Sequence, residues 1–546
     1  MNKLSFLYAY LFFTLSVPAQ VKPGLIWPLD SPRVLTGNFG ELRPNHFHTG
    51  LDFSTNGKEN LQVYAIEEGY VSRIRVSPFG YGKALYITHA NEKVSVYAHL
   101  NTFSLKIDKV LKEEQYAKQS FEVDFYPKPW SLFVRKNEII ALSGNTGGSS
   151  GPHLHFELRD EKTEVSINPL SVYHVLDKID PVLQELAFYD LCDTVQPAFL
   201  RSLKANGQGL AGDTLQLTTN RIGIGFQAYD QYLKNGNHNN VYEAKVFLDH
   251  ELIYHHRLEE MDFADFRYVN EFCDTRNHSK FQKCFLPALF PVYLFPAIKN
   301  KGRISLQDHK AHHLRLVLTD ESGNQTELNT FLRASLMKDF KIQNKTGDAF
   351  VHCNRDTALH VKQLSLHFPK LCSYNDLALA ITNNTEEGTF TMEPSNVNFR
   401  SAFYIGMIMP EKYKQEISQL VLKTEQSVVL PEFRNDSLWF TSKNTGTFKL
   451  MVDNTPPAVK TVLASKKRLP KSVRSRLEFY LSDNLSGIGK YALYVNEQWV
   501  IAEYEAKTHC LSYVFEEQSP LGWVNLRLVI TDKVGNRLEQ AYSIKR

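Results

Sequence analysis

Apolar and polar residues alternate along most of the first third of the chain, a pattern typical of strands. Between residues 33 and 170, short runs rich in β-branched and aromatic residues are bounded by Gly, Asn or Pro. The clearest runs are 34–40, 69–76, 83–89, 94–100, 138–142 and 153–158. Because successive side chains of a strand point to opposite faces of a sheet, each run can bury one face. This region is predicted to be an all-β sheet domain.

One segment within this region has a different pattern. Residues 104–119 are rich in Lys, Glu and Leu, and Ile107, Val110 and Leu111 recur at helical spacing. We expect a helical or irregular insertion here, within a longer stretch that runs from about 101 to 136. Two interpretations stay open for it: a solvated excursion of the chain, or a wall or lid beside a substrate groove.

From about residue 181 onward, strand-like runs alternate with polar turns, and a weak internal repeat is present. Residues 314–324 are similar to 526–536: each is an alternating strand that leads into an Asp-x-x-Gly-Asn turn. Upstream of them, 224–230 and 477–487 also correspond. Strands of this length with regular turns indicate β-sandwich domains of the immunoglobulin-like (Ig-like) type.

The chain is therefore predicted to be mainly β and to fold as several domains in series. With 546 residues it is too long for one hydrophobic core. The predicted parts are a signal peptide at 1–19, a first β domain at 20–180 with its core at 33–170, an Ig-like β-sandwich at 181–335, a further β domain at 336–452 and a second Ig-like β-sandwich at 453–546.

The N-terminus has the features of a secretory signal peptide. Lys3 supplies a positive charge, Leu4 to Leu15 is apolar, and Ala19 ends a site suited to signal peptidase. A membrane anchor would need about 20 apolar residues, and this run is shorter. We expect export and cleavage after Ala19, which leaves no membrane span in the mature protein.

Charge and cysteine content exclude some classes of function. Lys and Arg number 62 against 59 Asp and Glu, so the net charge of +3 is too small for a general nucleic-acid or membrane-surface footprint. All six cysteines lie beyond residue 190, and none has the CxxC spacing of a zinc cluster. Cys273 with Cys284, and Cys353 with Cys372, could pair in an exported protein; free buried thiols are the equal alternative.

Two short motifs contain most of the groups that could bind a metal. His48 and Asp52 are four positions apart, and His153 and His155 are two apart, so on strands each pair shares one face. Two such strands side by side would present imidazole and carboxylate groups on one surface, a donor set that suits Zn²⁺. A further histidine, His99, follows Tyr-Ala in one of the predicted strands. Periodicity does not decide which of His153 and His155 would bind the metal.

In these motifs the chain resembles the M23 family of lysostaphin/LytM-type zinc endopeptidases, whose fold is called the Duplicated Hybrid Motif. The resemblance covers about Val34 to Pro169. It rests on Asn38–Arg43, His48–Asp52, Val63–Val71, Tyr97–Leu100 and Gly144–Glu157, and no motif position is missing. The stretch 101–136 departs from the compact family pattern and leaves groove shape and substrate preference open.

The resemblance implies a role for each residue of the site. His48, Asp52 and His155 would bind Zn²⁺, and His153 would act as the general base toward the attacking water. His99 would be a second catalytic histidine that stabilises or protonates the tetrahedral intermediate. Histidine suits such proton transfer because its ordinary pKa lies near neutral pH.

For the whole protein, the resemblance implies an exported zinc endopeptidase that hydrolyses peptide cross-links between peptidoglycan stem peptides. A signal peptide with an Ig-like tail is similar to exported proteins of Bacteroidetes-type bacteria, which favours D-alanyl–diaminopimelate bonds and a location in the periplasm or cell envelope. The C-terminal β domains would position the enzyme against the wall or an envelope protein partner. The alternative is a catalytically silent LytM-like regulator or wall-binding module that activates another hydrolase.

Overall fold

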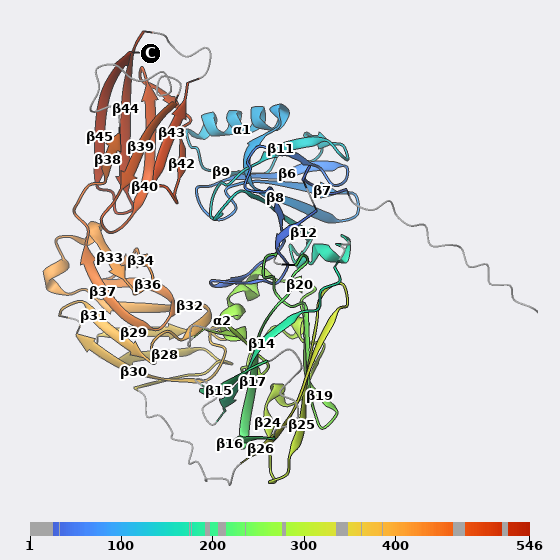
Figure 1. Cartoon of the computed structure of the whole chain (residues 1–546). Coiled ribbons are helices and arrows are strands. Elements are labelled where there is room, and N and C mark those ends of the chain that lie inside the picture. Colours follow the sequence, from blue (N-terminus) through green and yellow to red (C-terminus); the bar gives the residue numbers. More distant parts are fainter. Residues whose placement is uncertain are drawn as a thin grey trace, which may run out of the picture.

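The computed structural model shows a chain whose regular secondary structure is mainly strands, as the sequence predicts (Figure 1). The predicted signal peptide, 1–19, lies outside the described residues. The structure describes residues 26–545 except 32, 174, 176, 192–196, 206–213, 235, 276–279, 335–347, 362, 385, 462–475 and 516–521. The strands form successive β units, which we call the first (26–180), second (181–334), third (348–452) and fourth (453–545) unit.

The first unit is one antiparallel sheet with short strands attached at its edges. Its main path is β1 (Leu35–Gly37), β4 (Leu51–Ser54), β12 (His153–Asp160), β8 (Lys93–Phe103), β7 (Lys83–His89), β6 (Gly69–Val76) and β10 (Phe133–Val134). Off this path lie β5 (Gln62–Tyr64), β9 (Val123–Phe125), β11 (Ile139–Ser143), β13 (Ser166–Ile167) and, from the second unit, β20 (Glu260–Met261). A separate hairpin contains β2 (Leu42–Arg43) and β3 (His46–Phe47), and η1 (Pro169–Ser171) ends the unit.

Alternation along β12 gives this sheet a buried apolar face and a polar face. Leu154 and Phe156 are fully buried in the core of the unit, where Phe156 packs edge-on against Tyr97 of β8. His153 and His155 stand on the opposite face. The apolar side chains fix the register of the strand, because a shift by one residue would bury the histidines instead.

The predicted insertion contains α1 (Leu105–Lys118). Of the three residues at helical spacing, Ile107 and Leu111 are buried against the sheet and Val110 is partly buried. The helical interpretation of this segment is therefore confirmed. No helix in the described part of the chain is long and apolar enough to cross a membrane.

The second unit consists of two packed sheets. One contains β15 (Ala198–Lys204), β14 (Val182–Asp190), β17 (Arg221–Tyr229), β22 (Phe281–Lys283), β21 (Cys273–Asp274) and β24 (Ile304–Ser305). The other contains β16 (Thr214–Leu217), β26 (Gln325–Ala334), β25 (His312–Thr319), β18 (Glu243–Leu248), β19 (Glu251–Arg257) and β23 (Ala297–Ile298). Short helices η2 (Phe263–Tyr268), α2 (Val269–Phe272), η3 (Val292–Leu294) and η4 (Asn300–Gly302) lie between strands.

The third unit is also a pair of sheets around one core. The first sheet contains β27 (Ala349–Val351), β30 (Leu377–Asn384), β31 (Thr389–Glu393), β37 (Gly446–Val452), β33 (Leu420–Lys423) and β34 (Val428–Val429). The second contains β28 (Thr357–Val361), β29 (Leu364–Phe368), β32 (Asn398–Ile408), β36 (Ser437–Asn444) and β35 (Glu432–Arg434), and η5 (Glu411–Tyr413) and η6 (Ile417–Gln419) complete the unit.

The fourth unit has two smaller sheets. They contain β38 (Ala458–Thr461), β39 (Arg476–Ser482), β43 (Cys510–Val514) and β42 (Glu503–Glu505), and β41 (Gln498–Val500), β40 (Ile488–Val495), β44 (Trp523–Asp532) and β45 (Arg537–Lys545). Each of the second, third and fourth units thus pairs two sheets, the layered architecture expected of a sandwich.

The repeat found in the sequence takes the same form in the second and fourth units. After β25, Asp320 accepts hydrogen bonds from the backbone and side-chain amides of Asn324 at 2.9 and 2.7 Å. At the end of β44, Asp532 accepts the same two bonds from Asn536 at 2.8 and 2.7 Å. In both units the aspartate therefore closes the turn that leads to the next strand.

The four units follow one another in a ring, in which the fourth unit returns to contact the first (Figure 1). Lys83 of β7 forms an ion pair with Glu503 at 2.8 Å, and Tyr116 of α1 packs edge-on against Trp499 at 5.5 Å. Lys507 donates a hydrogen bond to the carbonyl of Ser149 at 3.2 Å. These contacts hold the fourth unit beside α1 and beside the loop that precedes β12.

The cysteines that the structure describes are all free. Cys273, Cys284, Cys353 and Cys372 are buried thiols and Cys510 is partly buried, while Cys192 lies outside the described residues. Neither of the two near-neighbour pairings considered from the sequence is formed. The alternative of free buried thiols holds for these four residues.

We predict that Gly50→Ala destabilises the first unit strongly. A Cβ at Gly50 would lie 2.2 Å from the carbonyl oxygen of Phe156, which is backbone and cannot rotate away. Overpacking of this kind costs about 1–3 kcal/mol, measurable as a lower midpoint of chemical unfolding. Gly151→Ala is the matched control, because a Cβ there meets nothing within 4 Å. Equal stability of the two variants would contradict this account of the packing between β4 and β12.

Candidate active site

Strand pairing brings two of the predicted metal ligands face to face. β4 and β12 run antiparallel with Asp52 opposite His155. His48 lies before β4, in the link that follows β3, so the expectation that His48 and Asp52 share one strand is wrong. Its backbone pairs instead with the preceding loop: His48 donates to the carbonyl of Glu41, and Gly40 donates to the carbonyl of His48. This backbone pairing with residues 40–41 directs the His48 ring toward Asp52.

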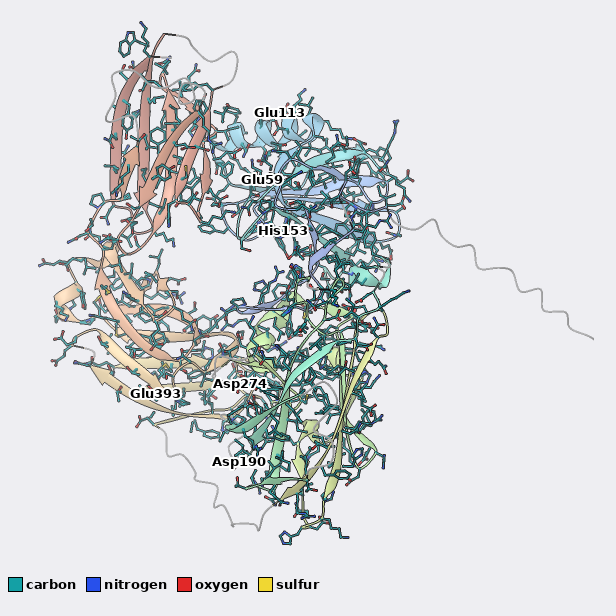
Figure 2. All side chains as sticks on the ribbon, in the orientation of Figure 1. Glu59, Glu113, His153, Asp190, Asp274 and Glu393 are labelled. Carbon is teal, nitrogen blue, oxygen red and sulfur yellow. The ribbon has the colours of Figure 1, made fainter. Side chains whose placement is uncertain are left out.

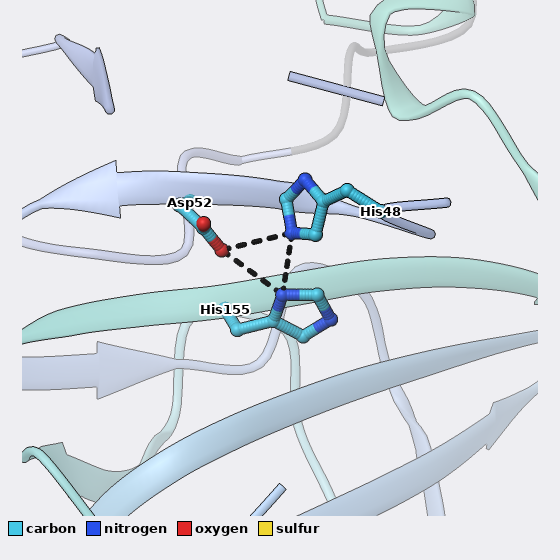
Figure 3. Close-up of side chains that lie close together, drawn as sticks. All are labelled: His48, Asp52 and His155. Atoms are coloured by element: carbon cyan, nitrogen blue, oxygen red, sulfur yellow. Dashed lines mark hydrogen bonds and ion pairs between the residues drawn. The ribbon is translucent and has the colours of Figure 1, made fainter. Parts of the chain in front are cut away.

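The three side chains converge on one point (Figure 3). His48 Nε2 lies 3.0 Å from Asp52 Oδ1 and 2.9 Å from His155 Nδ1, and His155 Nδ1 lies 2.9 Å from Asp52 Oδ1. Ligand atoms of a tetrahedral zinc centre stand about 3.3 Å apart, given metal–ligand bonds near 2.0–2.1 Å. The three atoms therefore already form nearly the triangle that a small divalent metal requires.

The far nitrogen of each ligand histidine is held by a fixed acceptor. His48 Nδ1 lies 2.7 Å from the carbonyl oxygen of Asn38, and His155 Nε2 lies 2.8 Å from Glu157 Oε1. Because a carbonyl or carboxylate oxygen can only accept, each of these nitrogens carries the proton. His48 Nε2 and His155 Nδ1 are consequently the nitrogens that can present a lone pair to a bound metal, the form in which imidazole is a ligand.

Asp52 is also held on its far side. Arg43 donates to Asp52 Oδ2 at 2.5 Å and to Glu41 at 3.1 Å, so Arg43 forms a structural ion pair in this structure. The pKa of Asp52 is well below its ordinary value: burial would raise it, but the neighbouring His48, and then His153 and His155, lower it more. Asp52 is a carboxylate with Oδ1 free to act as a single-oxygen ligand.

Glu157 is buried beneath His155 and has donors on both of its oxygens. Oε1 accepts from Thr49 at 2.6 Å and from Tyr81 at 2.5 Å, and Oε2 accepts from Arg159 at 2.7 Å. Burial alone would raise the pKa of Glu157, but Arg159 and His155 lower it by more. The net pKa is below the ordinary value, so the group is ionised. Burial alone would lower the pKa of His155, whereas hydrogen bonds to Asp52 and Glu157 raise it to about 9. A site with this much negative charge favours a cation.

His153 and His99 stand beside the triangle with one ring nitrogen each free. His153 Nδ1 lies 2.8 Å from the carbonyl of Gly151, and His99 Nδ1 lies 2.8 Å from the carbonyl of Thr146. Their rings are 4.8 Å apart, and buried His153 Nε2 has no hydrogen-bond partner among the described residues. His153 Nε2 is 3.4 Å from Asp52 Oδ1, farther than the two ligand nitrogens. Burial, and then the neighbouring His153 and His155, lower the pKa of His99 to about 3, so its ring is neutral.

A β-bulge places His99 on the polar face. Lys83 pairs with Leu100 and Leu85 with Tyr97, so two steps along β7 oppose three along β8. Ala98 pairs with His155 and therefore faces the site. Strict alternation would place the side chain of the next residue, His99, in the core. His99 instead has φ +57°, in the left-handed region that is uncommon for residues other than glycine. The bulge therefore presents two consecutive residues on one face.

An open groove of about 1120 Å³ lies over the cluster. Its lining includes His46, His99, His153 and, from η2 of the second unit, Phe263 and Phe266. The second unit therefore forms one wall of the groove: Phe263 stacks on Arg159 at 4.3 Å, and Phe266 lies 6.3 Å from the ring of His46. An open groove of this size suits a segment of polymer rather than a small enclosed ligand.

The predicted insertion does not reach this groove. None of the described residues in the stretch 101–136 lines it. In Figure 2, Glu113 of α1 lies well apart from His153, on the edge of the first unit beside the fourth. The interpretation of this segment as a wall or lid is therefore wrong for this structure, because the apolar side of α1 packs on the sheet and its outer end meets Trp499.

Sequence reasoning missed several residues around the site. Glu157 could have been found, because it lies two positions after His155 in the same strand and must share its face. Tyr81 precedes β7 and carries no periodic signal, although its hydroxyl contacts Glu157. Phe263 and Phe266 come from another unit, and their approach depends on contacts that no local pattern encodes.

Comparison with known proteins agrees with this geometry. The family model described as "Peptidase family M23" matches residues 46–118, which include His48, Asp52 and His99. The chain contains a peptidase family M23 domain. This is a metallopeptidase family, and the donor set described above fits it. β12, with His153 and His155, follows the matched segment.

Curated relatives match about a quarter of the chain. An uncharacterized metalloprotease of Haemophilus influenzae is 32% identical over 133 residues, 24% of this chain and 22% of the relative. The DD-carboxypeptidase/endopeptidase Mpg of Neisseria meningitidis is 33% identical over 125 residues, 23% of this chain and 22% of the relative. A zinc-containing peptidase of Vibrio cholerae with a solved structure is 27% identical, with a TM-score of 0.19 over 25% of this chain and 37% of that one. The chain thus spans less than a quarter of the length of the two curated relatives.

We predict that Glu157→Gln weakens metal binding by roughly 10–100-fold, the usual effect of losing a group that orients a ligand histidine. The amide keeps the shape of the side chain but removes the charge that fixes the proton on His155 Nε2. A competition titration against a chromophoric chelator measures the affinity.

Glu164→Gln is the matched control for this variant, because Glu164 pairs with the same Arg159 at 3.7 Å but is 63% exposed. Its metal affinity should equal that of the unaltered protein. Equal affinities for both variants would show that Glu157 does not support His155.

Proposed function

We propose that this protein is an exported zinc endopeptidase that hydrolyses peptide cross-links in peptidoglycan. The observation that supports it most directly is the arrangement of five side chains. Three ligand atoms form a triangle with edges of 2.9–3.0 Å, and two further imidazoles stand beside it with their Nε2 atoms toward the site. Zinc peptidases need this division between groups that hold the metal and groups that move protons.

Zn²⁺ is the metal that the donors fit best. Two imidazole nitrogens and one carboxylate oxygen, with further coordination left open, are the donor set of a catalytic rather than a structural zinc site. The triangle contains His48, Asp52 and His155 and no fourth His, Cys, Asp or Glu ligand among the described residues. When bound, zinc would supply Lewis-acid polarisation of the scissile carbonyl and lower the pKa of a water.

The geometry supports His155 as the ligand and His153 as the general base. His155 Nδ1 belongs to the triangle, whereas His153 Nε2 is displaced from Asp52 to 3.4 Å and lacks a partner in the described part of the chain. With its Nδ1 proton donated to Gly151, His153 would accept a proton from the attacking water at Nε2. The carbonyl of Gly151 would then stabilise the doubly protonated ring.

His99 is suited to a second proton-handling role. Its Nδ1 proton is donated to Thr146, so Nε2 is the atom directed toward reacting groups. A neutral ring with a low pKa gives up an added proton readily, which fits transfer to the departing amine of the cleaved peptide. The bulge in β8 would hold His99 at this place without help from the metal.

The substrate assignment rests on the relatives and the groove. Relatives in Neisseria and Vibrio bear the names DD-carboxypeptidase/endopeptidase and peptidoglycan DD-endopeptidase, which favours D-alanyl–diaminopimelate cross-links here. An open groove over the site accommodates a stem peptide attached to a glycan strand. Such a substrate requires export to the periplasm or cell envelope, in agreement with the signal peptide expected at 1–19.

We predict that the purified protein with zinc converts cross-linked muropeptides of diaminopimelate-type sacculi into monomers. Removal of metal by a chelator should abolish the release, and added ZnCl₂ should restore it. Mass spectrometry of the digest identifies the bond from the new termini. Zinc-loaded protein that leaves sacculi intact, yet stimulates another wall hydrolase, would instead support the regulatory alternative.

We also predict that His153→Ala and His155→Ala lose peptidase activity for different reasons. His153→Ala should bind one equivalent of zinc and lose roughly 10²–10⁴-fold in activity, the usual contribution of a general base. His155→Ala should lose zinc as well as activity. His89→Gln is the control, because His89 is buried in the same sheet but bonded to Glu68 and Ser95. Loss of zinc from His153→Ala with retention in His155→Ala would reverse the two roles.

A further inference from the structure

Two clusters of three aspartates lie at junctions between units, away from the candidate active site. In each cluster, one carboxylate oxygen from every aspartate lies within 4.8 Å of the others. The first cluster lies where the first unit meets the second, and the other lies where the third meets the fourth. Their members are Asp177, Asp230 and Asp320, and Asp453, Asp483 and Asp532.

The two clusters are built by the same chain segments. Asp177 lies five positions before Val182, where β14 begins, and Asp453 lies five positions before Ala458, where β38 begins. Each of these strands pairs antiparallel with the strand that ends immediately before the second aspartate. Val182 faces Tyr229, the residue before Asp230, and Ala458 faces Ser482, the residue before Asp483.

The third aspartate of each cluster is the one that closes the repeated turn. Asp320 follows β25 and Asp532 ends β44, and each is followed by Gly-Asn at the same spacing. A linker, a strand end and a turn therefore meet in the same way in two units. Because only three short segments of weak sequence similarity are involved, a shared ligand accounts for the repetition better than shared core packing.

The first cluster contains negative charge that the protein itself does not balance. Asp230 is 0% exposed, and neither of its carboxylate oxygens has a hydrogen-bond partner among the described residues; the same is true of Asp177 Oδ2. Burial, and then Asp320 and Asp177, raise the pKa of Asp230 to about 7. A buried carboxylate without a donor is unfavourable unless a cation or a proton accompanies it.

The second cluster is better balanced, because Asp453 and Asp532 accept backbone N–H bonds, and one carboxylate oxygen is left without a donor among the described residues. Asp453 is 0% exposed, and Asp483 Oδ1 has no partner in the described ranges. Ser486, which is 2% exposed, donates its backbone amide to Asp453 at 2.8 Å, while its hydroxyl is also without a partner there. These two oxygens, one carboxylate and one hydroxyl, are groups that can coordinate a cation.

We propose that each cluster binds a Ca²⁺ ion that joins two neighbouring units. All three side chains of each cluster offer oxygen, the donor that hard cations prefer, and no nitrogen or sulfur ligand that would select zinc. Ca²⁺ accepts six to eight oxygens in irregular geometry, whereas Mg²⁺ demands a near-octahedral shell. Donors from a linker, a strand end and a turn suit the more tolerant ion.

The first Ca²⁺ would also stabilise the candidate active site through Asn38. Glu321, next to Asp320, accepts from the Asn38 side chain at 3.4 Å, and Asn38 exchanges hydrogen bonds with Asn240 of the second unit at 2.8 and 2.9 Å. The Asn38 carbonyl is the acceptor that orients His48. Ordering of this junction would therefore hold both the groove wall and a zinc ligand in place.

Calorimetric titration of the metal-stripped full chain with CaCl₂, in the presence of one equivalent of ZnCl₂, tests the proposal without any activity assay. We expect two Ca²⁺ per chain, one in either Asp230→Asn or Asp483→Asn, and none in the double variant. Ca²⁺ should raise the melting temperature of the unaltered protein. Without Ca²⁺, Asp230→Asn should melt at or above the unaltered protein, because it removes an unbalanced buried charge.

Asp265→Asn is the matched control, because Asp265 is a buried aspartate of the second unit that pairs with Arg400 outside the cluster. It should keep both Ca²⁺ sites even if its stability falls. Absence of Ca²⁺ binding up to about 10 mM, ten times above the weakest affinities of extracellular Ca²⁺ modules, would overturn the proposal. So would two remaining sites in Asp230→Asn, or equal binding of MgCl₂.

Discussion

The antiparallel pairing of β4 with β12 is the constraint on which the candidate site depends. It sets Asp52 directly opposite His155, and the apolar residues on the reverse face, such as Leu154 and Phe156, prevent the register from slipping. Gly50 permits this approach, since any larger residue would collide with the carbonyl of Phe156. The geometry of the metal ligands is thus determined by the hydrophobic core beneath them.

Outward from the ligands, each histidine is oriented by an acceptor that the fold supplies. Asn38, Glu157, Gly151 and Thr146 accept from the far nitrogens, which leaves the other four ring nitrogens facing one region. Removal of such acceptors would leave rotating rings with uncertain tautomers. Because Asn38 is itself held by Asn240, the second unit contributes to the site as well as to the groove wall. The second unit is therefore part of the candidate site and not only a tether.

Much of the fold and the site follows from local patterns, and the remainder depends on contacts between distant segments. Alternation predicts the strands and the two faces of β12, and helical spacing of apolar residues predicts the helix at 105–118. It places His153 with His155, and by the same logic Glu157 could have been added. Alternation does not predict the position of His99, because a bulge in β8 turns this side chain to the polar face. The position of α1 and the approach of Phe263 depend on packing between units, which no period of hydrophobic residues encodes.

The central claim is that one open zinc site is held by His48, Asp52 and His155 while His153 and His99 remain unligated. A crystal structure of the zinc-loaded protein, with anomalous diffraction at the zinc edge, tests it most directly. The account predicts a single strong peak within about 2.0–2.2 Å of His48 Nε2, His155 Nδ1 and Asp52 Oδ1, with further coordination by solvent. A peak ligated by His153 or His99, or a fourth ligand from the protein, would contradict it.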